Sequence, residues 1–108
     1  MIKALFEISA EAMHIRISGH ANSSPHGHDL VCAGVSSVAI GALNALKRPT
    51  DFRITNEEGL LEMTSNIEPS DHDKTVLYTM KRQLETIAEA HPKSIKITTK
   101  GSHHHDDV

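Results

Sequence analysis

A histidine and the chain's one cysteine stand at either end of a short polar segment, and this pair is the part of the sequence best suited to chemistry. His20 follows a run of alternating apolar residues, and Cys32 lies near the start of a run with helical spacing. If the strand before His20 ends beside the start of that helix, imidazole and thiol come within reach of each other. A base beside a thiol is the minimum for an activated nucleophile, so the pair predicts thiol chemistry.

The position expected for Cys32, about three residues into a helix, favours this chemistry. The first amides of a helix have no intrahelical acceptor, and that end carries partial positive charge. Such surroundings favour the thiolate over the thiol. The same amides can hold the oxyanion that forms when a thiolate attacks a carbonyl.

Other interpretations of these residues stay open. Cys32 borders the apolar stripe that holds Val31 and Val35, so it can be an inert core residue. Asp29 is suited to act as the N-cap of the helix. A redox sensor is a further alternative, although the absence of a second cysteine to resolve a sulfenic acid counts against it.

The remaining histidines are weaker candidates. His26, His28 and Asp29 have the side chains of metal ligands, but a closed zinc site needs four well-placed ligands. We therefore expect no metal and no cofactor. His14 and His91 are expected at the surface or at an edge rather than in a catalytic site.

The first third of the chain predicts a hairpin and a loop. Apolar residues alternate over 2–8 and again over 13–17, with a short turn at 9–11, which is typical of two strands with one buried face. Gly19 ends the second strand. Residues 19–29 hold almost nothing apolar, so they are expected to form an irregular loop.

A helix is expected from Leu30 to the break at Pro49, because apolar residues recur there at spacings of three and four. Gly34 and Gly41 lie inside it, and each costs about 1 kcal/mol relative to alanine. We expect close packing against the sheet to offset that cost.

The second half repeats the pattern of a hairpin followed by a helix. A hairpin is expected over 52–64 with its turn at 56–59. Ser70 and Asp73 resemble a capping box that opens a second helix, and Pro92 closes that helix.

A last strand around 95–98 completes the order β-β-α-β-β-α-β. This order predicts an α+β fold: a single two-layer domain with a mainly antiparallel sheet and two helices on one face. Residues 1–100 are expected to form that domain, and 101–108 a flexible polar tail.

Composition limits the partners. The 108 residues include 11 basic and 14 acidic side chains and no tryptophan, so the basic, aromatic surface typical of nucleic-acid binding is missing and no direct nucleic-acid partner is expected. No apolar run approaches the roughly 20 residues that cross a bilayer, and the first residues lack a secretion signal. We expect a cytoplasmic protein without membrane contact.

Two stretches, Gly-His-Ala at 19–21 and Asp-Leu-Val-Cys-Ala-Gly-Val-Ser at 29–36, resemble the ribosomal-processing cysteine proteases, the Prp family. The length of the segment between them fits as well. The agreement is strongest over 19–36, and the order of the expected elements agrees from end to end.

The resemblance implies a cysteine endopeptidase that removes the N-terminal extension of a large-subunit ribosomal protein (number twenty-seven). By position, it implies that Cys32 is the nucleophile and His20 the general base, with Asp29 and Ser36 in supporting positions. It also implies that the protein forms a homodimer. The partner that it implies is the precursor of that ribosomal protein. The alternative is a ribosome-associated binding or assembly factor without catalysis.

The same resemblance suggests a substrate loop. Gly19, Ala21, Asn22 and Gly27 lie in the polar segment, which we expect to order over an extended peptide. Asn22 departs from the family pattern, which commonly has glycine there.

Overall fold

The computed structural model describes residues 1–9, 11–20 and 25–101, and for 25–29 it describes the main chain alone. The predicted order of elements is confirmed. A short 3-10 turn, η1, precedes the second hairpin. The elements are β1 (Ile2–Ile8), β2 (Met13–Ser18), α1 (Pro25–Ala45), η1 (Pro49–Asp51), β3 (Phe52–Glu57), β4 (Leu60–Ser65), α2 (Asp71–Ala90) and β5 (Ile95–Gly101).

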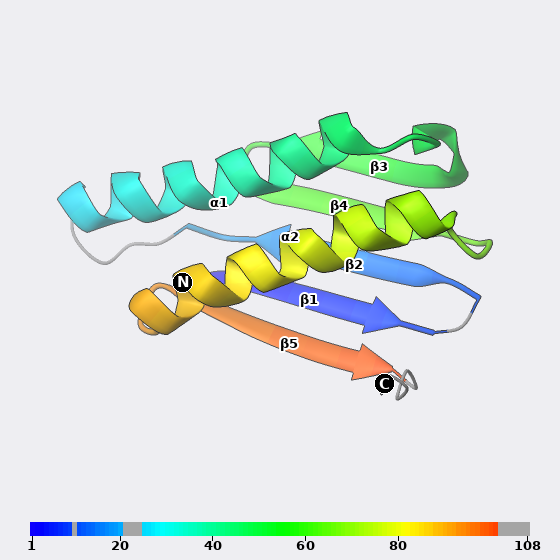
Figure 1. The fold of residues 1–108 in the computed structure, drawn as a ribbon. Helices are drawn as coiled ribbons and strands as arrows, with labels where there is room; N and C mark the ends of the chain where they lie inside the picture. The colour runs from blue at the N-terminus through cyan, green and yellow to red at the C-terminus, as the bar shows by residue number, and fades with distance from the viewer. Residues whose placement is uncertain (10, 21–24, 102–108) are drawn as a thin grey trace.

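The five strands form one sheet in the order β3-β4-β2-β1-β5. Strands β1 and β5 pair in parallel, and the other neighbours pair antiparallel. Both helices lie across the same face of this sheet (Figure 1). The two-layer, mainly antiparallel fold predicted from the sequence is therefore confirmed.

Alternation along the strands builds the core. Successive side chains of a strand point to opposite faces, and in β1 every second residue is buried. The register places Phe6 of β1 opposite Ile15 of β2, and Ile15 opposite Met63 of β4, so their side chains line one face beneath the helices. These three side chains belong to the hydrophobic core.

Helix α2 begins as predicted. The Ser70 hydroxyl accepts the amide hydrogen of Asp73 at 3.2 Å, which makes Ser70 the N-cap. The Asp73 carboxylate is buried, and it accepts the amide hydrogens of Lys47 and Arg48 at 2.8 and 3.0 Å. One side chain thus ties the start of α2 to the segment that follows α1.

Helix α1 begins earlier than predicted, at Pro25 rather than Leu30. Proline is favoured at the first helical position because it has no amide hydrogen to satisfy, while the polar residues that follow carry no apolar stripe. The expected loop is therefore shorter, and Gly27 lies on the helix. Asp29 is its fifth residue, so the N-cap interpretation of Asp29 is wrong.

The two helical glycines do not pack against the sheet as expected. A methyl group on Gly34 would lie 3.5 Å from Cδ1 of Ile87 in α2, whereas one on Gly41 would meet no described atom within 4 Å. An alanine at Gly34 would make an ordinary contact with α2, so close packing of the described atoms requires glycine at neither position. Neither α1 nor α2 combines the length and the apolar character needed to cross a membrane.

Candidate active site

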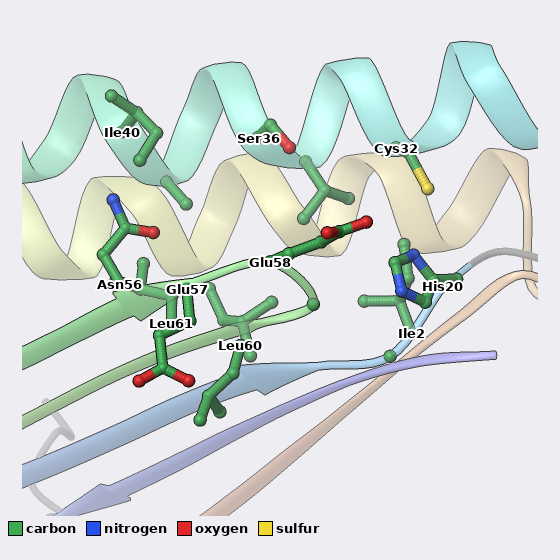
Figure 2. A pocket seen from close by; sticks show the side chains of 15 residues that line it. Ile2, His20, Cys32, Ser36, Ile40, Asn56, Glu57, Glu58, Leu60 and Leu61 are labelled. Atoms are coloured by element: carbon green, nitrogen blue, oxygen red, sulfur yellow. The ribbon is translucent and has the colours of Figure 1, made fainter.

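His20 and Cys32 line one pocket of about 320 Å³ between α1 and the β3–β4 turn. Figure 2 shows the thiol of Cys32 directed from α1 toward the imidazole of His20. His20 lies just after β2, whereas Cys32 lies on the helix that covers the sheet. The structure thus brings together the two residues that the sequence singled out.

The main chain around His20 is held on two sides. The amide of Gly19 donates to the carbonyl of Gly59 at 3.0 Å, which extends the pairing of β2 with β4 by one residue. The N-terminal ammonium of Met1 donates to the carbonyl of His20 at 2.6 Å. His20 therefore has a fixed main-chain position at the end of the sheet.

Cys32 is half-buried and packs against the core cluster with its thiol at the pocket. It is not one of the fully buried residues, which disfavours the inert-core alternative. It is the eighth residue of α1, past the first turn, where free amides and the helix dipole act. The expected activation of Cys32 by a helix N-terminus is therefore wrong, because α1 begins a turn earlier.

The rest of the pocket has mainly apolar walls and an acidic rim. Ser36 follows Cys32 by one helical turn and lines the same pocket. Figure 2 shows the carboxylate of Glu58 directed into the space below α1, and Glu58 lines the same pocket as His20, so the rim of the pocket carries an acidic group. The apolar walls come from the sheet and from α1; they include Ile2, Ile17, Val35, Ala39, Leu60 and Leu61.

The β3–β4 turn lies where the sequence predicts a turn, but its place beside the pocket was not predicted. Glu58 and Gly59 line the same pocket as His20, and a Cβ atom on Gly59 would lie 3.1 Å from the His20 ring, yet both follow His20 by more than 35 residues. A glycine within a short hairpin turn was the available signal, but it points to a turn and not to a site.

Several other predicted site residues belong to the part of the chain that the structure does not describe, or describes by its main chain alone. Ala21 and Asn22 lie outside the described residues, and so do the side chains of His26, His28 and Asp29. Among the described side chains, no group of three or more histidine, cysteine or acidic residues is placed to hold a metal ion.

His14 and His91 lie away from the pocket, as expected. His14 lies on the sheet face opposite the helices, half-buried, with Nδ1 2.7 Å from Glu7 and Nε2 2.6 Å from Glu62. Two hydrogen bonds raise the pKa of His14: the one to Glu7 has the larger effect, and the one to Glu62 the second largest. His91 is the C-cap of α2.

Comparison with known proteins gives one consistent result. The family model for "Cysteine protease Prp" matches residues 1–96. The ribosomal processing cysteine proteases Prp of Staphylococcus aureus and Bacillus subtilis are each 34% identical to this chain, over 89 and 95 residues. The alignment with the S. aureus protein covers 78% of this chain and 83% of that protein. The alignment with the B. subtilis protein covers 81% of this chain and 85% of that protein.

The likeness extends to solved structures. The crystal structure of the S. aureus protease Prp in complex with a covalently linked product peptide is 30% identical in sequence and has a TM-score of 0.79. The match covers 93% of this chain and 100% of that chain. Sequence and fold therefore agree over nearly the whole chain.

Proposed function

Because the chain belongs to the cysteine protease Prp family, and so is a cysteine-type peptidase, we propose that Cys32 is its nucleophile and His20 its general base. The observation that carries the proposal is the arrangement in Figure 2, where the thiol faces the imidazole across one pocket. Both residues also stand at the positions that the family resemblance assigns to these roles.

The proposed reaction follows the usual course of thiol acyl transfer. His20 takes the proton of Cys32, and the sulfur attacks the scissile carbonyl carbon. The carbon–nitrogen bond then breaks, and the protonated imidazole gives its proton to the leaving amine. Water, deprotonated by His20, hydrolyses the thioester and restores the thiol. A covalently linked product peptide in the S. aureus relative supports a covalent route.

The proposed substrate is the precursor of the large-subunit ribosomal protein number twenty-seven, from which the enzyme removes the N-terminal extension. The curated relatives are named as ribosomal processing proteases. The apolar walls of the pocket are suited to hold apolar side chains of an extended peptide. We further propose one domain over 1–100 and a cytoplasmic homodimer that binds neither nucleic acid nor membrane directly.

The supporting residues belong to this proposal as well. Ser36 lines the pocket, and Asp29 precedes Cys32 by three residues on α1, which puts the two on neighbouring positions of the helix surface. Gly19, Ala21, Asn22 and Gly27 are proposed to take part in substrate binding.

Incubation with the extended ribosomal-protein precursor tests the function, with the cleavage position read by mass spectrometry. We expect one cut that releases the extension, and a rate at least about 100-fold lower for His20→Ala. His91→Ala is the matched control, since His91 ends α2 away from the pocket, and its rate should stay near wild type. Binding of the precursor without any cleavage by the wild type would favour the alternative of a non-catalytic assembly factor.

A further inference from the structure

We propose that Gly59 is a positioning residue that seats the imidazole of His20, an inference that rests on the proposed role of His20 as the base. Gly59 ends the two-residue turn between β3 and β4, whose flanking residues Glu57 and Leu60 pair in register. The turn forms one side of the pocket that holds His20 and Cys32.

The ring of His20 occupies the space that a side chain on Gly59 would need. A Cβ atom on Gly59 would lie 3.1 Å from Nε2 of His20, 3.6 Å from Cε1 and 4.0 Å from Cδ2. The first distance is shorter than ordinary van der Waals contact, so any side chain here forces the ring or the turn to move. The absence of a side chain on Gly59 thus leaves room for the imidazole in its present position, and a Cβ atom there would require a shift of a few tenths of an ångström.

The main chain of Gly59 also helps to hold the main chain beside His20 in place. Its carbonyl accepts the amide hydrogen of Gly19, the residue directly before His20. Cys32, by contrast, lies on α1, an element separate from the turn. The placement of the base relative to the nucleophile therefore depends on where this turn holds the ring.

A turn requirement alone also explains a glycine here, because Gly59 has φ +76°. Short hairpin turns use such left-handed conformations, which glycine adopts freely and asparagine adopts more readily than other residues. The two explanations differ in what asparagine does. It satisfies the turn, yet its Cβ meets the imidazole as that of alanine does.

Cleavage by Gly59→Asn and Gly59→Ala separates the two explanations. We expect both variants to lose about tenfold or more in kcat, since small misplacements of a catalytic group are costly, with Gly59→Asn melting closer to wild type than Gly59→Ala. Gly41→Ala is the matched glycine control, because its Cβ meets no described atom within 4 Å, and its kcat should not change. A wild-type kcat for Gly59→Asn would overturn the inference.

A double-mutant cycle with His20→Ala shows whether Gly59 acts through His20. The readout is the pH profile of Cys32 alkylation by iodoacetamide. We expect Gly59→Asn to change this profile when His20 is present and to leave it unchanged when His20 is absent. An equal change in both backgrounds would assign Gly59 a structural role only and overturn the inference.

The same experiments separate this inference from the proposed function. If His20→Ala cleaves at the wild-type rate, His20 is not the base, and both proposals fail. If His20→Ala is inactive while Gly59→Asn is fully active, the proposed function stands and only the positioning role is overturned.

Discussion

A methyl group on Gly19 would overlap the carbonyl oxygen of Met1, because the start of β1 passes directly beside the residue that precedes His20. Gly19 also has φ +97°, a conformation that residues with a side chain rarely adopt. Two independent constraints therefore require glycine immediately before the proposed base.

Gly19→Ala is expected to lower the free energy of unfolding by about 2 kcal/mol or more, because left-handed strain of 1–2 kcal/mol adds to the overlap with Met1. Denaturant unfolding measures the change. Gly41→Ala is the control, and it should raise stability by up to about 1 kcal/mol, since alanine is the better helix former. A Gly19→Ala protein as stable as the wild type would contradict the close approach of β1.

Asp73→Ala should be among the more destabilising changes outside the pocket. The substitution leaves the amides of Lys47 and Arg48 without the carboxylate that accepts their hydrogen bonds. A hydrogen bond to a charged acceptor contributes about 1.5 to 3 kcal/mol, and water replaces part of it at the exposed Lys47 and Arg48, so the loss of both should cost about 2 to 4 kcal/mol. Asp71→Ala is the matched control in the same helical turn; Asp71 is exposed, and its loss should cost less than about 1 kcal/mol. Equal losses for the two variants in chemical denaturation would argue against the role of Asp73.

His14 makes stability depend on pH. Protonated His14 links β1, β2 and β4 by donating to Glu7 and Glu62, and these hydrogen bonds raise its pKa above the ordinary 6.5. Because the folded pKa is the higher one, the stabilisation is complete below pH 6.5 and is lost as the pH rises through the folded pKa. The hydrogen bond to His14 lowers the pKa of Glu7 below 4.5, so that contribution is lost only as the pH falls through the lowered value.

Melting curves of the wild type and of His14→Gln test this linkage. From about pH 6 to about pH 8.5, the melting temperature of the wild type should fall more than that of His14→Gln. Titration of the other histidines is common to both proteins and cancels in the comparison. Parallel pH curves would mean that the three strands gain nothing from protonation of His14.

Asp29→Asn tests the charge of Asp29 apart from helix stability. Since Asp29 is the fifth residue of α1 and not its N-cap, removal of its charge should change the melting temperature little. We expect slower precursor cleavage, because the proposed supporting role of Asp29 is to stabilise, by its negative charge, the protonated imidazole formed during the reaction. A cleavage rate at or above that of the wild type would remove Asp29 from the proposed machinery.

The fold followed from local patterns wherever a pattern marked a buried face. Alternation over 2–8 and the helical spacing of Leu77, Met80 and Leu84 are visible in the sequence, and these residues form the core. The parallel pairing of β1 with β5 was not predictable, because alternation identifies a strand without identifying its neighbour. The start of α1 was missed because residues 26–29 are polar, and Pro25 was the one local signal.

The site was predictable only as far as its dyad. His20 and Cys32 each belong to a short motif, and motifs can be read from the sequence. The contacts that hold His20 come from Met1 and Gly59, which are distant along the chain and act through the main chain or through a missing side chain. Contacts of these two kinds do not depend on a recognisable pattern of residue types along the sequence, so they could not be predicted from it.

Cleavage of the extended precursor by Cys32→Ala, measured beside its melting temperature, tests the central claim most directly. The substitution removes one sulfur from a half-buried position on α1, so the melting temperature should stay within a few degrees of wild type. If Cys32 is the nucleophile, the cleavage rate should fall at least about 1,000-fold. A near-wild-type rate from a folded Cys32→Ala protein would contradict the account.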